Sequence, residues 1–140
     1  FLLAYNAALF DYYRKNKDTS VERYKILDGT SELEISDFQS LTEIWSSSDA
    51  RIRVGLTLTN SSEIEARAFI DRHRSWYRKQ FINSDELFTH EVYHVKLAQA
   101  LAKDLNKKIK TYKYDREKTV FKLSIYLEKL KNLQSKYDLE

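Results

Sequence analysis

The stretch RIRVGLTLT at residues 51–59 decides the fold class. Its apolar residues stand at every second position, which is the period of a strand with one buried face. A lone strand cannot satisfy its own backbone, so this interpretation needs a partner from residues 24–35. Asp28-Gly29 is a turn signal that would form a short hairpin there. Helix signals surround the stretch, however, and we favour helix or irregular structure for it, with a short hairpin in 24–59 as the alternative.

Helix patterns without a breaker follow this stretch to the C-terminus. Both glycines precede residue 56, and the chain has no proline. Asn60-Ser61-Ser62-Glu63 and Asn83-Ser84-Asp85-Glu86 are typical helix starts, in which acids follow a capping residue. They predict a helical hairpin over 62–112 and a long C-terminal helix, with a bend near 111–115 or one rod over 85–137. The apolar faces at helical spacing are Ala66, Phe69, Ile70, His73, Trp76, Tyr77 and Phe81, then Leu87, His90, His94, Leu97, Leu101, Leu105, Ile109 and Tyr112.

The N-terminal part of the chain, residues 1–59, is less regular than residues 60–140. Residues 2–16 predict a helix, and Ser36 or Asp37 can cap a second helix through Trp45. With 140 residues, the chain has the length of one domain. We therefore predict a mainly α fold: one helical domain over 1–140, a bundle of four or five helices that ends in the long C-terminal helix.

Composition excludes several chemistries. The chain has no cysteine, which rules out disulfides, thiolate metal sites and a cysteine nucleophile. Two glycines leave no phosphate-binding glycine loop. No spacing of serine, histidine and aspartate supports nucleophilic catalysis.

The segment His90-Glu91-Val92-Tyr93-His94 matches the pattern HExxH. Positions i and i+4 of a helix place two imidazoles on one face, where they can share a zinc ion, and the glutamate can take a proton from water. The segment resembles the catalytic helix of zinc metallopeptidases, which implies zinc as cofactor and Glu91 as catalytic base. The residues around the segment depart from the pattern of those enzymes, since Lys96 stands where they favour an apolar residue. The sequence does not identify a third metal ligand, although Glu117 lies near one spacing that such enzymes use.

His73 offers a further metal ligand. His73 and His94 lie about equally far from the turn near 82–85, so two antiparallel helices would bring them together. We therefore expect His73, His90 and His94 to meet inside the bundle. We favour buried, hydrogen-bonded histidines there, and the alternatives are a pH-sensing or ligand-binding polar layer and a metal site.

Charge and apolar residues indicate partners. Residues 97–140 carry 11 basic and six acidic side chains, which is typical of a solvated helix face, and a nucleic-acid site over 103–122 is the less favoured interpretation. That basic patch comprises Lys103, Lys107, Lys108, Lys110 and Lys113.

The last helix has a coiled-coil-like seam, which predicts self-association or a protein partner. The seam comprises Leu123, Leu127, Leu130 and Tyr137. The apolar run from Phe1 to Phe10, followed by basic residues, resembles the end of a membrane span that precedes Phe1.

These signals favour a non-enzymatic interaction, sensor or scaffold module without a cofactor. It would be cytoplasmic or lie on the cytoplasmic face of a membrane. A zinc-dependent hydrolase built on HEVYH and a nucleic-acid binder are the alternatives.

Overall fold

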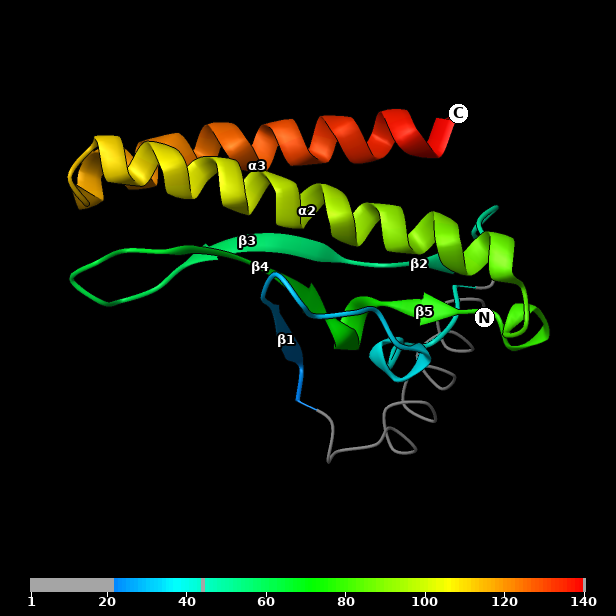
Figure 1. Ribbon diagram of the computed structural model, residues 1–140. Helices are drawn as coiled ribbons and strands as arrows, with labels where there is room; N and C mark the ends of the chain where they lie inside the picture. Colours follow the sequence, from blue (N-terminus) through cyan, green and yellow to red (C-terminus); the bar gives the residue numbers. More distant parts are fainter. Residues whose placement is uncertain (1–21, 44, 140) are drawn as a thin grey trace, which may run out of the picture.

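Two small antiparallel sheets and a helical hairpin make up the part of the chain that the structure describes (Figure 1). This computed structural model describes residues 22–43 and 45–139, and the helix predicted over 2–16 lies outside them. The strands are β1 (Tyr24–Leu27), β2 (Ala50–Arg51), β3 (Val54–Leu58), β4 (Ala66–Asp71) and β5 (Trp76–Tyr77). The helices are α2 (Asp85–Thr111) and α3 (Arg116–Leu139), with single 3-10 turns η1 (Ile35–Asp37), η2 (Arg72–Arg74) and η3 (Lys79–Phe81).

The stretch 51–59 is a strand, so the helix favoured for it is wrong. β3 pairs antiparallel with β4, and β1 pairs with the other edge of β4, giving the order β1-β4-β3. Ile52 and Leu56 are buried and Val54 packs against the same core, as the two-residue alternation requires. Gly55 faces Phe69 across the ladder, and a Cβ atom there would lie 2.6 Å from the ring. Glycine at this position therefore lets an aromatic ring cross the strand.

The helix predicted over 62–82 is also wrong. Residues 66–71 form β4, whose buried face is Ala66, Ala68 and Ile70, and η2 and β5 follow. The apolar residues of this segment fit the period of a helix as well as that of a strand. Phe69 causes this ambiguity, because it is apolar but lies on the face of the sheet opposite the buried one, beside Tyr24. This segment lies between β1 on one edge and β3 on the other. That position favours a strand, since only a strand can pair with both neighbours.

The prediction of a mainly α bundle of four or five helices is therefore wrong. The described residues contain two α-helices and five strands, and they form no coiled coil. The helix expected from Ser36 or Asp37 to Trp45 is reduced to η1, and β1 pairs with β4 instead of forming a hairpin with 32–35. Of the two alternatives that the sequence left open for 85–137, one rod or two helices, the structure has two helices with the turn between Thr111 and Arg116. None of the described helices is long and apolar enough to cross a membrane.

The helical hairpin has well-defined ends. The Ser84 side chain accepts the backbone N–H of Leu87 and caps α2, and Asp115 caps α3 by accepting the N–H of Lys118. Between the helices, Lys113 and Tyr114 adopt φ angles of 52° and 60°. The turn is thus made in the left-handed region without glycine, which is a strained solution for both residues.

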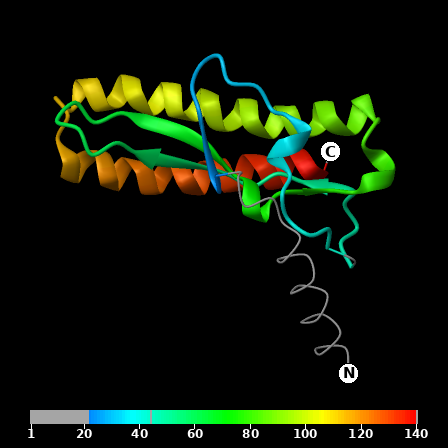
Figure 2. The ribbon, with the colours of Figure 1, turned by 90° about the horizontal axis from the view of Figure 1, so that it is seen from below.

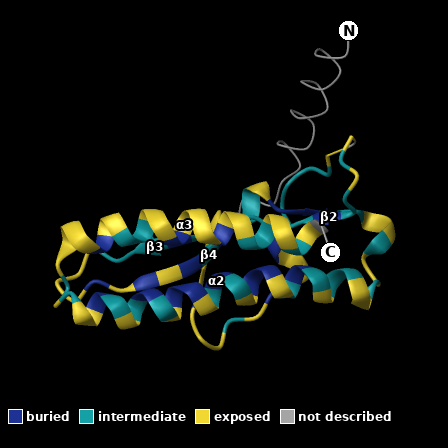
Figure 3. Cartoon of the chain, turned by 90° about the horizontal axis from the view of Figure 1, so that it is seen from above, coloured by how far each residue is buried: buried dark blue, intermediate teal, exposed yellow. Residues whose placement is uncertain are grey.

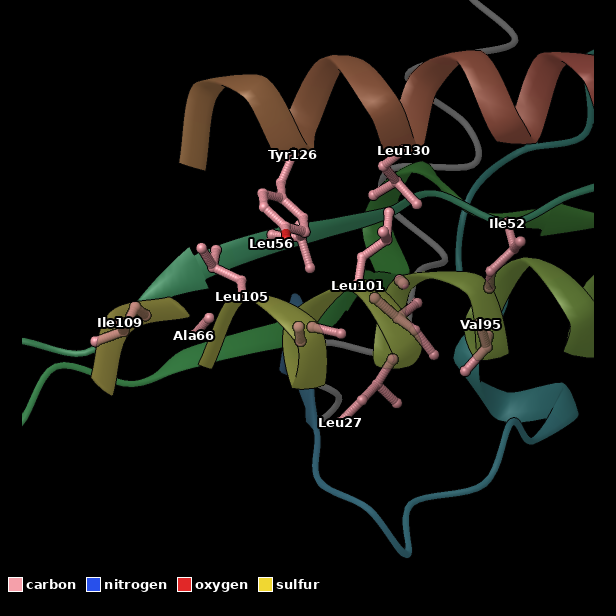
Figure 4. Close-up of a cluster of buried hydrophobic side chains, with 14 of the residues drawn as sticks. Leu27, Ile52, Leu56, Ala66, Val95, Leu101, Leu105, Ile109, Tyr126 and Leu130 are labelled. Carbon is pink, nitrogen blue, oxygen red and sulfur yellow. The ribbon is translucent and has the colours of Figure 1, made fainter. Parts of the chain in front are cut away.

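The core lies between the sheet and the two helices. Viewed from below, β3 and β4 run along the seam between α2 and α3 (Figure 2). Along α2 and α3, buried residues alternate with exposed ones, so that each helix has a buried side and an exposed side (Figure 3). Leu101 and Leu105 of α2 meet Leu56 of β3 and Tyr126 and Leu130 of α3 (Figure 4).

Two polar contacts fix the sheet to the rest of the chain. The Asn106 amide accepts the backbone N–H of Ala66 and donates to its carbonyl, at 2.6 and 2.9 Å, as a neighbouring strand would. The fully buried Asp37 carboxylate receives Lys25 at 2.9 Å and Arg72 at 3.0 Å. Asn106 thus joins β4 to α2, and Asp37 joins β1 and η2 to η1.

Candidate metal centre

The HExxH segment lies in the N-terminal half of α2. His90 and His94 are one helical turn apart, and their ring centroids are 5.2 Å apart. The His94 side chain is 6% exposed and that of His90 is 34% exposed. The helix therefore places the two imidazoles on one face, as the spacing predicts.

The hairpin brings a carboxylate onto these two rings. α3 returns along α2 until its C-terminal end lies over the half that begins at Asp85 (Figure 1). There Asp138 Oδ1 lies 3.0 Å from His90 Nε2 and 2.7 Å from His94 Nε2. The neighbouring Tyr137 ring stacks on His90 with centroids 4.3 Å apart.

The three side chains fit the donor set of a catalytic zinc ion. Their ligand atoms all lie within 4.8 Å of one another. Two imidazole nitrogens and one carboxylate oxygen leave the fourth tetrahedral position for water or substrate. Ligands at about 2.0–2.1 Å around one ion lie about 3.3 Å apart. Asp138 would therefore move away from the two rings by less than 1 Å, and ligand atoms that lie as far as 4.8 Å apart would move closer by up to about 1.5 Å.

The ionisation of His94 and Asp138 also suits a cation. Burial lowers the pKa of His94, against the opposing pull of Asp138, so its imidazole is held neutral. Burial opposes ionisation of Asp138, but the hydrogen bonds from His90 and His94 bring its pKa below the ordinary value. Neutral imidazoles and an ionised carboxylate are the forms that bind metal.

Glu91 lies beside this group and is 3% exposed. Its Oε2 accepts the backbone N–H of Ile52 at 3.1 Å, which fixes the carboxyl group against the strand segment. Burial raises its pKa to about 7. A carboxyl group with these properties can hold or release a proton near neutrality.

An open cleft of about 830 Å³ reaches the histidines, Glu91 and Asp138. Residues 47–55 form one wall, the C-terminal half of α3 forms the other, and α2 forms the floor. Arg78 organises the first wall by donating to the carbonyls of Glu43, Ser46 and Ser48 and pairing with Asp49. Among the described residues, no strand pairs with the outer edge of β3, and the Ile52 and Arg53 N–H groups of this wall donate to Glu91 and Ser75.

The other residues predicted from sequence lie elsewhere. His73 is on η2, outside the group of three ligands, because the helix that would have turned it toward His94 does not form. Glu117 lies in the first turn of α3, at the far end of the hairpin.

The predicted seam of α3 packs mostly within the chain. Leu130 is buried, Leu123 packs against the core, Tyr137 stacks on His90, and Leu127 lines the cleft while 40% exposed. The basic patch stays on the outer side of α2 and at the turn, where Lys103, Lys107, Lys110 and Lys113 are exposed and Lys108 is half-buried.

Sequence reasoning missed Asp138, although a signal for it exists. Asp138 lies 23 residues after Asp115, and His90 lies 22 residues before Tyr112. Counting outward from the bend near 111–115 would have paired them across the hairpin. Comparison of the chain with protein-family models, curated proteins and solved structures finds no match, so function is inferred from the geometry of this site.

Proposed function

We propose that the protein is a zinc-dependent hydrolase that cleaves peptide bonds. One observation carries this proposal: a single Asp138 oxygen meets both imidazole Nε2 atoms of the HExxH segment, from a helix distant in sequence. Histidine pairs with one carboxylate and an open cleft are the arrangement of catalytic rather than structural zinc. His90, His94 and Asp138 are the proposed ligands, and zinc is the proposed cofactor.

The cleft favours an extended polypeptide as substrate. No described strand pairs with the outer edge of β3 in its wall, and such an edge can bind an extended chain through backbone hydrogen bonds. The wall also touches the proposed base, since the Ile52 N–H holds Glu91. A substrate on this edge would thus lie beside the group that activates water.

The chemistry follows from these positions. A bound zinc ion would polarise the acyl oxygen and acidify water. Glu91 accepts a proton from the attacking water, whose oxygen forms a bond to the acyl carbon. The proton then passes from Glu91 to the amide nitrogen as the C–N bond breaks. The products are a carboxylic acid and an amine, and Glu91 returns to its ionised state.

Zinc binding is the first test. Protein stripped with EDTA is dialysed against buffered Zn²⁺, and bound zinc is measured by elemental analysis. We expect about one equivalent, and at least 10-fold weaker binding in His94→Ala and Asp138→Ala, since loss of an outer-shell partner alone costs about that much. His73→Ala is the matched control and should bind zinc like the wild type. Uptake of less than about a tenth of an equivalent by the wild type contradicts the proposal.

Catalysis is the second test. The zinc-loaded protein should release acid-soluble peptides from fluorescein-labelled casein. Glu91→Gln should keep its zinc and lose about 10²–10⁴-fold in turnover, which separates the base from the ligands. A Glu91→Gln variant as active as the wild type would remove Glu91 from the mechanism.

An interaction module is a second candidate, favoured by one exposed apolar row. Val120, Phe121 and Ile125 of α3 are 49%, 69% and 44% exposed, and apolar side chains grouped in this way often mark an interface. Light scattering at high concentration tests self-association through this row, and a monomer that Phe121→Ser does not alter contradicts it. Nucleic acid stays the least favoured partner.

A further inference from the structure

Gln134 of α3 lines the same cleft as the candidate metal ligands. Its side-chain Nε2 is buried and has no hydrogen-bond acceptor among the described residues. The indole Nε1 of Trp76 is also buried without an acceptor, but Trp76 does not line the cleft. A buried donor without an acceptor is costly, and in a cleft the missing acceptor can come from a ligand.

The position of Gln134 relative to Asp138 is fixed by the helix. Residues four apart share a face and are about 6 Å apart along the axis. Gln134 therefore lies one turn before Asp138 on the face that forms the cleft wall. Leu130, one turn further back, is buried, so along this face of α3 Gln134 lies between an apolar residue and a proposed metal ligand. A preorganised donor in such a poorly hydrated position interacts strongly with developing negative charge.

We propose that Gln134 binds the carbonyl oxygen of the scissile amide and stabilises the negative charge that forms on it. This inference rests on the proposed hydrolase function. When the water oxygen bonds to the acyl carbon, the π electron pair of the C=O bond moves to the oxygen, which accepts the Gln134 N–H. The pair returns to reform C=O as the C–N bond breaks and the leaving nitrogen takes its proton from Glu91.

Three variants separate this role from packing. Gln134→Leu removes the donor and keeps most of the volume, and Gln134→Glu keeps the shape but offers no N–H when ionised. Asn132→Leu is the matched control, because Asn132 is exposed on the same helix and lies in a different surface groove. Circular dichroism and zinc content show whether each variant is folded and loaded.

The probe is the phosphinic peptide Ac-PheΨ[PO₂CH₂]-Ala-Ala-NH₂, whose phosphinate oxygen stands in for the charged carbonyl oxygen. Binding to zinc-loaded protein is measured by calorimetry. We expect Gln134→Leu and Gln134→Glu to bind it about 10²-fold more weakly with unchanged zinc affinity, and the control to bind it normally. Casein turnover should fall by a similar factor through kcat, with KM changed by less than about 2-fold. The side-chain amide resonance of Gln134, assigned by its loss in Gln134→Leu, should move when the probe is added.

The outcomes distinguish the two proposals. Equal affinity of the wild type and Gln134→Leu for the probe, or a Gln134 resonance that does not move, overturns the role of Gln134. Zinc uptake without any binding of the probe overturns it too and leaves the metal site standing. Absence of zinc uptake by the wild type overturns the proposed hydrolase function, and with it the role proposed for Gln134.

Discussion

Replacement of Glu91 by glutamine should stabilise the metal-free protein above neutral pH. Burial raises the pKa of this carboxyl from 4.5 to about 7, so between these values the folded chain holds a proton that the unfolded chain releases. The free energy of unfolding therefore falls as pH rises from about 4.5 to about 7. One pH unit of difference corresponds to about 1.4 kcal/mol, so ionised Glu91 destabilises the folded state by about 3 kcal/mol above pH 7. Glutamine avoids this cost and still offers an oxygen to the Ile52 N–H.

Urea unfolding in EDTA, followed by circular dichroism at pH 5 and pH 8, measures the effect. The stability of Glu91→Gln relative to the wild type should increase by about 2.5 kcal/mol between these pH values. Glu86→Gln is the matched control: Glu86 is exposed in the first turn of the same helix, and its substitution should change stability by less than about 0.5 kcal/mol at either pH. A Glu91→Gln effect that does not vary with pH, or a variant less stable than the wild type at pH 8, would refute the reasoning from burial.

Three further substitutions test the packing around the site. Asp37→Ala leaves two cations without their buried partner and should lower the free energy of unfolding by about 3 kcal/mol in urea; a loss below 1 kcal/mol would contradict this. Asn106→Ala removes both hydrogen bonds to the backbone of Ala66, should cost about 1–3 kcal/mol, and should speed hydrogen exchange at the Ala66 amide, which would otherwise stay slow. Leu130→Ala should cost about 2–5 kcal/mol through a core cavity, against about 1 kcal/mol for the 40% exposed Leu127; equal losses would show that α3 packs differently.

The helical half of the chain was predictable, and the sheet was not. Ser84 and the acids after it determine the start of α2 through local hydrogen bonds, which sequence spacing reveals. β4 depends on partners that are distant in sequence: Leu27 lies opposite Ala68, and Leu56 lies opposite the same residue on the other edge. Alanine favours helices when it is considered alone, so the segment around Ala68 shows its strand character only when both neighbours are in place.

The candidate site was predictable only where its residues are close together in the sequence. His90, Glu91 and His94 lie on one helix, so a spacing rule finds them. Asp138 joins them through the antiparallel return of α3, and no local pattern marks it. Gln134 has no signal of its own in the sequence, because its significance comes from a buried donor without an acceptor on a residue that lines the cleft.

The turn at Lys113 and Tyr114 has a mechanical consequence for Asp138. At about 1.5 Å per residue, Asp138 lies about 35 Å from this turn along α3, so a rotation of one degree there would shift its carboxylate by about 0.6 Å. Metal–ligand distances tolerate about 0.2 Å. The hydrogen bond between Tyr126 and Asp104, midway along the hairpin, therefore limits the rotation of α3 relative to α2. Substitutions of Tyr126 or Asp104 should change the affinity for metal from more than 10 Å away without touching a ligand.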